Sequence, residues 1–161
     1  MTKKPFVYGK YTKEEELALD AFKRAYTGCT SVTEFEPTEY GVYYDVWGKN
    51  KNGQVEHIEL KLRKDGSDRF STCFIETEKW HNLLKDFRER QEKPLPIYIN
   101  FIGDASNVYV WDLSKVKHAE FHGNICIDGE MCDRIGLSWK DAWHFVQDAE
   151  TGIYNLVNRG N

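Results

Sequence analysis

A single dipeptide, Asn52-Gly53, restricts the fold of this chain more than any other feature. It lies between two segments in which apolar and polar residues alternate, 40–47 and 55–64. Asn-Gly readily adopts the left-handed backbone that a tight turn between antiparallel strands requires. The sequence therefore predicts a β-hairpin whose two strands are antiparallel neighbours, with Asp45 near the end of the first strand.

The second strand of this hairpin divides its side chains between two faces. Its apolar and charged residues alternate, with Ile58, Leu60 and Leu62 on one side and Glu59, Lys61 and Arg63 on the other. Because successive side chains of a strand point to opposite faces, the charged set shares one face. Taken alone, this spacing is typical of a strand with one face in water.

A capping box predicts the first helix, from Thr12 to Tyr26. Thr12 is followed three residues later by Glu15, and Gly28 is expected to end the helix. On a helical wheel, Glu15 lies in the middle of the side that carries Phe22. We therefore expect the Glu15 carboxylate to point inward.

The other elements are predicted from hydrophobic spacing and turn residues. We expect a turn at 64–69, a strand at 70–76, a helix at 77–91, strands at 95–102 and 107–113, and loop with a short strand over 115–136. Ser138 and Asp141 predict a cap for a last helix around 139–148. The predicted class is α/β, in the order α, β, β, β, α, β, β, followed by a C-terminal strand and helix appendage.

Length and composition indicate one folded domain. The chain has 161 residues, of which 40% are hydrophobic and 30% charged, and its net charge is −4. We expect a single domain over 1–161, with a core at about 10–115 and the appendage at about 116–161. No apolar run approaches the roughly 20 residues that span a bilayer, and the N-terminus lacks the apolar core of a signal peptide. A cytoplasmic protein is expected, and the acidic charge excludes a non-specific coat on nucleic acid.

The combination of an Asp with a Glu-x-Lys on neighbouring strands has a specific chemical use. Two carboxylates hold a hard divalent cation such as Mg²⁺ through oxygen. A lysine on the same face as the glutamate can orient or help deprotonate the attacking water and stabilise charge on a phosphate. In this sequence the trio is Asp45, Glu59 and Lys61, with Glu15 entering from the first helix.

This combination resembles the PD-(D/E)xK nuclease superfamily, which has the restriction-endonuclease-like or Holliday-junction-resolvase-like fold. The resemblance covers roughly residues 10–115, and its motif is Asp45 followed, after a hairpin, by Glu59-Leu60-Lys61. It implies an αβββαβ core with a central mixed sheet flanked by helices. It also implies an endonuclease that hydrolyses DNA phosphodiester bonds with Mg²⁺ or Mn²⁺, held by Asp45, Glu59 and Glu15, while Lys61 serves the attacking water.

Further residues are expected around such a site. The candidates for a positively charged rim that contacts DNA are Lys49, Lys51, Arg63, Lys64 and Arg69. Glu76 is expected either beside the metal ligands or simply near the N-terminus of the following helix, where the helix dipole favours a carboxylate. Cutting both strands of DNA commonly takes two active sites, which favours a homodimer.

Two other interpretations stay open. The chain could be a non-catalytic protein-binding module on a nuclease-like or another α/β fold. Residues of zinc-ligand type also lie within fifteen positions, namely His118, His122, Cys126 and Cys132. Zinc is not favoured, because a close Cys-x2-Cys pair is missing and Cys126 lies between two isoleucines, where a buried thiol is natural.

Overall fold

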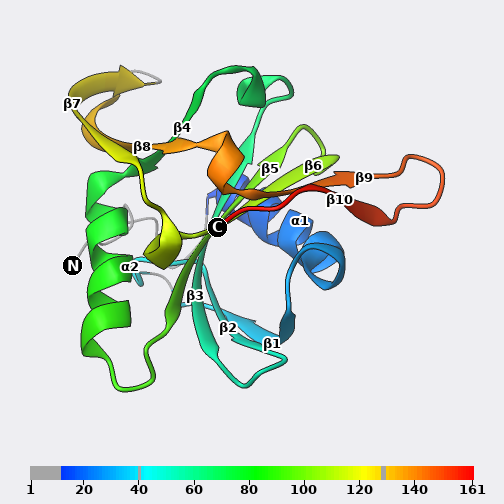
Figure 1. Cartoon of the computed structure of the whole chain (residues 1–161), viewed down its shortest axis with the longest axis horizontal. Coiled ribbons are helices and arrows are strands. Elements are labelled where there is room, and N and C mark those ends of the chain that lie inside the picture. The colour runs from blue at the N-terminus through cyan, green and yellow to red at the C-terminus, as the bar shows by residue number, and fades with distance from the viewer. Residues whose placement is uncertain (1–11, 40, 128–129) are drawn as a thin grey trace.

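The computed structural model describes residues 12–39, 41–127 and 130–161; of residues 124–127, 130 and 131 it describes the backbone only. This part of the chain is α/β and forms two α-helices and two sheets (Figure 1). The helices are α1 (Lys13–Cys29) and α2 (Thr77–Glu89). No helix among these residues is both long and apolar enough to cross a membrane.

The larger sheet has seven strands in the order β1-β2-β3-β5-β6-β9-β10. Their bounds are β1 (Val32–Pro37), β2 (Val46–Asn50), β3 (Val55–Arg63), β5 (Leu95–Ile102), β6 (Asn107–Asp112), β9 (Trp143–Gln147) and β10 (Tyr154–Asn158). The smaller sheet has three strands in the order β4-β8-β7. Its strands are β4 (Thr72–Glu76), β8 (Glu130–Ser138) and β7 (Ala119–Ile127), and single 3-10 turns lie at Ser67–Arg69, Leu113–Lys115 and Trp139–Asp141.

The predicted hairpin is confirmed. β2 pairs antiparallel with β3, with Val46 opposite Ile58. Gly53 has φ +78°, a backbone conformation that glycine adopts without strain. The Asn50 side chain closes the turn, because its Oδ1 accepts hydrogen bonds from the amides of Asn52 at 3.0 Å and Gln54 at 3.1 Å.

The first hairpin strand begins later than predicted. β2 starts at Val46, so Asp45 immediately precedes the strand; of the predicted range 40–47, Tyr40 lies outside the described residues. Gly41, at φ +95°, turns the chain before β2. A strand that the sequence did not predict, β1, pairs antiparallel with the outer side of β2. β1 was not predicted because its mostly polar side chains show no regular alternation of apolar and polar residues. Five of its six residues are at least partly exposed.

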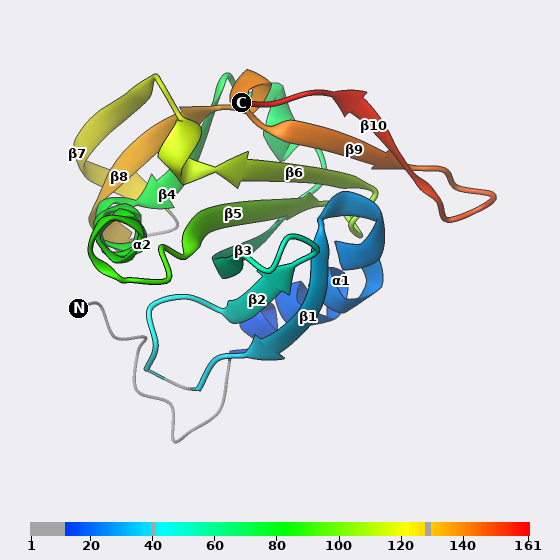
Figure 2. The ribbon, with the colours of Figure 1, turned by 60° about the horizontal axis from the view of Figure 1, so that its bottom comes forward.

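β3 is a central strand covered on both faces. It pairs in parallel with β5, and α2 lies in the connection between the two. One core packs α1 against Ile58, Ile99 and Phe101. The other packs α2 and the smaller sheet against Tyr98 and its neighbours. The two helices therefore cover opposite faces of the larger sheet, as Figure 2 shows.

Three predictions for later segments need correction. The strand predicted at 70–76 forms as β4 but belongs to the smaller sheet, where it pairs with β8. The segment 115–136, expected to be loop with a short strand, contains β7 and most of β8, which pair with each other. The last helix, predicted around 139–148, is wrong: Ser138 caps only a 3-10 turn, and β9 follows and pairs with β6. The free edge of β6 offers a ladder of hydrogen bonds that outweighs the local helix signal.

The first helix forms as predicted at its N-terminus and runs to Cys29. Thr12 Oγ1 accepts the amide of Glu15 at 3.2 Å, and Glu15 Oε1 accepts the amide of Thr12 at 3.1 Å. Gly28 does not end the helix; Thr30 is the C-cap, where its amide donates to the carbonyl of Tyr26. The capping box is thus complete on both sides.

We expect Thr12→Ala to lower the free energy of unfolding by about 1 kcal/mol, because it removes the side chain that caps α1. Thr27→Ala is the matched control, since Thr27 is exposed in the last turns of the same helix. There, alanine's higher helix propensity should leave the stability unchanged or slightly raised. Urea unfolding followed by circular dichroism measures both variants. An equal loss in the two would contradict a stabilising role for the cap.

Candidate active site

The charged face of β3 is the face covered by α2 and the smaller sheet. Glu59 is buried, with 4% of its surface exposed, whereas Lys61, two residues further along the strand, is exposed. Both line one cavity of about 460 Å³. The prediction that these two side chains share a face is confirmed, and the face passes from protein interior at Glu59 to solvent at Lys61.

Charged side chains from five elements gather around this cavity. Besides Glu59 and Lys61 of β3, the charged lining residues are Glu14, Arg63, Lys64, Glu76, Lys79 and Arg134. Four of the six additional side chains are basic, so the cavity combines carboxylates with an excess of positive charge. Such a combination suits an anion that is bound together with a cation.

Asp45 lies directly beside this group. Its Oδ2 accepts the amide of Leu60 at 2.9 Å, and its own amide donates to the carbonyl of Ile58 at 2.9 Å. Leu60 is the residue between Glu59 and Lys61, so these bonds fix the Asp45 carboxylate next to the Glu-x-Lys segment. The structure thus brings Asp45, Glu59 and Lys61 together, as the spacing predicts.

Lys79, from α2, was not among the predicted site residues. Its Nζ donates to Glu59 Oε1 at 2.5 Å, and this ammonium is mostly covered, with 22% of the side chain exposed. Burial disfavours its charge, but the carboxylates of Glu59, Glu76 and Asp45 outweigh burial and hold the pKa of Lys79 above its ordinary value. The Asp45 and Glu59 carboxylates therefore act on the same positive charge.

Arg63 is held by the protein rather than standing free at the rim. Its guanidinium donates to Asn100 Oδ1, to the carbonyl of Phe74 at 2.8 Å and to the Tyr98 hydroxyl at 3.2 Å. Burial raises the pKa of Tyr98 to about 12, so that the hydroxyl stays neutral and donates to the carbonyl of Phe74. Arg63 still lines the cavity, with its position fixed by strands β4 and β5.

The other predicted basic residues do not form one rim. Lys64 lines the cavity, and Arg134 of β8 joins it without having been predicted. Lys49 and Lys51 lie toward the opposite end of β3, at the hairpin turn, and Lys51 lines a different cavity. Arg69 donates to the carbonyl of Gly66 and does not line the cavity. A contact between any of them and DNA stays a prediction.

The two additional carboxylates differ in their placement. Glu76 is the N-cap of α2 and lines the cavity, close enough to act on the charge of Lys79. Glu15 takes part in the capping box, whereas its neighbour Glu14 lines the cavity. A role for Glu15 in holding a metal stays a prediction.

Among the described side chains, no three His, Cys, Asp or Glu residues lie close enough together to hold a metal ion. At the Glu59 site, the carboxylate already pairs with the ammonium of Lys79. Of the four residues of zinc-ligand type, the Cys126 side chain lies outside the described part, and His122 lies 3.6 Å from Glu120 Oε2 and edge-on to Phe74.

His57 lies on the same face of β3 as Glu59, two residues earlier in the strand. It is buried and stacks on Tyr44 with ring centroids 3.9 Å apart. Its Nδ1 lies 3.2 Å from Asp86 Oδ2 without the geometry of a hydrogen bond. Burial, together with the nearby Arg90 charge, lowers the pKa of His57 to about 4. His57 is therefore neutral and serves packing.

This burial predicts a pH dependence of stability. Between its ordinary pKa of 6.5 and the folded value of about 4, the unfolded chain binds a proton at His57 that the folded chain does not. Stability contributed by His57 is thus complete above pH 6.5 and is lost as the pH falls, by up to about 3 kcal/mol. His57→Phe keeps a ring on Tyr44 and cannot titrate. We expect the unfolding free energy of the unmodified protein to fall relative to that of His57→Phe as the pH drops from 6.5 toward 4; parallel pH curves would contradict this.

No family model, no curated protein and no solved structure matches this chain. Its chemistry is therefore inferred from the arrangement of its own residues. The strongest part of that arrangement is the group made by Asp45, Glu59, Lys61 and Lys79.

Proposed function

We propose that this chain is a divalent-metal-dependent nuclease of the PD-(D/E)xK type, which hydrolyses phosphodiester bonds in DNA with Mg²⁺ or Mn²⁺. The observation that carries the proposal is the position of Asp45, whose carboxylate is held on the amide of Leu60, between Glu59 and Lys61. This hydrogen bond places the Asp45 carboxylate beside both charged members of the Glu-x-Lys segment.

The order of elements in the larger sheet supports the same proposal. α1 is followed by three antiparallel neighbours, β1, β2 and β3, and then by α2 and β5, which is parallel to β3. Along the chain, β4 of the smaller sheet comes between β3 and α2, so the order is αβββαβ only within the larger sheet and its two helices, and its strands are not all those that the sequence predicted. Fold resemblance does not establish activity, so the chemistry must rest on the site.

Two neighbouring carboxylates, Asp45 and Glu59, would be the protein ligands of a hard divalent cation, and waters and phosphate oxygens would complete its shell. Glu59 is buried and has a positive partner, Lys79, as a buried carboxylate requires. Asp45 supplies the second set of carboxylate oxygens, the ligand type that Mg²⁺ and Mn²⁺ prefer. A bound metal would polarise the phosphate and supply a water of lowered pKa.

The chain's own residues would perform the remaining tasks. Lys61 lies on the exposed side of Glu59 and can orient the attacking water or take a proton from it. Arg63, held rigidly by Asn100 and Phe74, and Lys64 can pair with phosphate oxygens. These charges would stabilise the negative charge that develops on the phosphate. Cleavage of both DNA strands would call for a homodimer.

The Glu59–Lys79 ion pair favours a second candidate. If the pair is permanent, the ammonium excludes a metal, and the chain would be a non-catalytic binding module on the same scaffold. The two candidates differ in whether Lys79 gives up its place to a divalent ion.

Activity is tested by incubating the protein with supercoiled, linear, single-stranded and branched DNA in Mg²⁺ or Mn²⁺. We expect cleavage that falls by roughly a hundredfold or more in Glu59→Gln and in Lys61→Ala, because each removes a group that acts on the reacting phosphate or water. Lys85→Ala, an exposed substitution on α2, is the control and should keep full activity. Cleavage that survives both site substitutions would sink the assignment of these residues.

Metal binding is tested independently by titrating Mn²⁺ into the protein in a calorimeter. We expect Lys79→Gln to bind Mn²⁺ about tenfold more tightly or better, because it removes a competing charge from Glu59. Glu59→Gln should abolish binding, and Lys85→Gln should leave it unchanged. Binding that is the same with and without Lys79, or that persists in Glu59→Gln, contradicts a metal site at Glu59.

A further inference from the structure

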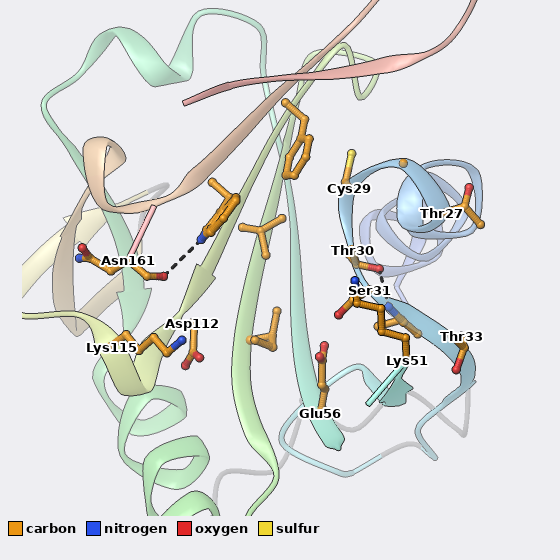
Figure 3. A pocket seen from close by; sticks show the side chains of 16 residues that line it. Thr27, Cys29, Thr30, Ser31, Thr33, Lys51, Glu56, Asp112, Lys115 and Asn161 are labelled. Carbon is orange, nitrogen blue, oxygen red and sulfur yellow. Dashed lines mark hydrogen bonds between the residues drawn. The ribbon is translucent and has the colours of Figure 1, made fainter. Parts of the chain in front are cut away.

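A second and larger cavity lies on the opposite face of β3. Its volume is about 700 Å³, within the range of small-molecule sites, and it lies between the C-terminal end of α1, the larger sheet and the end of the chain (Figure 3). The sheet provides apolar walls from Ile97 of β5, Val110 of β6 and Phe145 of β9, and Val32 of β1 closes the other side. This cavity shares no lining residue with the nuclease site.

One buried carboxylate lies among these apolar walls. Glu56 of β3 has 5% of its surface exposed, and Figure 3 shows its side chain pointing into the hollow. Among the described residues its hydrogen-bond donor is Asn50, whose Nδ2 lies 2.9 Å from Glu56 Oε2. Asn50 is itself fixed, because its Oδ1 accepts the amides of Asn52 and Gln54 in the hairpin turn. The turn thus orients Oε2 of a carboxylate that lines the cavity.

The charges around Glu56 do not neutralise it. Lys115 extends toward Asp112 on the rim, and Lys51 lies across the cavity beside Ser31 and Thr33 (Figure 3). α1, whose C-terminal end borders the cavity, has no basic residue in its last turn, so the helix itself supplies no charge that would offset the negative end of its dipole. Burial raises the pKa of Glu56 above its ordinary value; the hydrogen bond from Asn50 opposes this shift, and the nearby Asp112 adds to it.

We propose that this cavity binds an amphipathic organic cation, with an ammonium or amidinium group on Glu56 and an apolar body against Val110 and Phe145. A desolvated carboxylate in an apolar site is costly unless a cation pairs with it, and an organic cation supplies both the charge and the apolar surface. The aromatic wall is suited to the same ligand class. Trp143, which lines the cavity, already holds the Arg159 guanidinium 5.0 Å from its ring centroid.

The test uses two probes of the same shape, phenethylamine and 2-phenylethanol, titrated calorimetrically at about pH 8, where the amine is protonated and Glu56 is more fully ionised. We expect phenethylamine to bind the unmodified protein at least tenfold more tightly than the alcohol. Glu56→Gln should lower the affinity for the amine at least tenfold and leave the affinity for the alcohol unchanged. Glu36→Gln, an exposed carboxylate on β1, is the matched control and should bind as the unmodified protein does.

A second variant separates loss of the site from loss of the fold. Val110→Phe fills the cavity without removing a charge and should abolish binding of both probes, with an unchanged circular dichroism spectrum. The proposal is overturned if the amine binds the unmodified protein no better than the alcohol, if it shows no binding up to about 10 mM, if Glu56→Gln keeps the affinity of the unmodified protein for the amine, or if Val110→Phe binds both probes normally.

Discussion

The burial of β3 on both faces is the constraint on which the rest of the structure depends. A strand between β2 and β5, covered by α1 on one side and by α2 on the other, offers little water to the polar side chains of its buried part, although Lys61 further along reaches solvent. The buried charged side chains therefore need partners inside the protein. Glu56 accepts a hydrogen bond from Asn50 at the hairpin turn, and Glu59 accepts one from Lys79 of α2. Arg63 donates to Asn100 of β5 and to the Phe74 carbonyl of β4. The positions of several elements are therefore tied to this one strand.

The period of two along β3 also separates its chemistry into two places. Glu56 and Glu59 are three residues apart and so point to opposite faces. Glu56 enters a cavity with apolar walls, where Asn50 is its hydrogen-bond donor among the described residues, whereas Glu59 enters a cavity rich in basic side chains. The same residue type therefore faces two different environments, which is why the two proposals assign different ligands to them. The sheet between them keeps the two apart.

Elements that are determined by residues close together in the sequence could be predicted from the sequence alone. The Asn52-Gly53 turn, the capping box at Thr12 and the apolar spacing of α2 are each decided within a few residues, and all three form. β1 and β9 could not be recognised, because their stability comes from pairing with β2 and β6 rather than from their own sequence. That Glu59 and Lys61 share one face could also be predicted, because it depends only on the two-residue period of a strand. The contact between Lys79 and Glu59 could not be predicted, since it depends on how α2 packs over the sheet.

A gain in the stability of the fold does not explain why Glu59 and Lys79 form an ion pair in the interior. Desolvating two charges costs about as much as their attraction returns, and an apolar pair of similar volume is often as stable or more so. The carboxylates of Glu59, Glu76 and Asp45 raise the pKa of Lys79, so that the ammonium stays charged although burial disfavours its charge. Glu59 thus has a cation beside it, next to Asp45, in a cavity that reaches solvent at Lys61. The proposed metal site requires that a divalent ion replace this ammonium, whereas a permanent ion pair would make the same residues a non-catalytic polar contact.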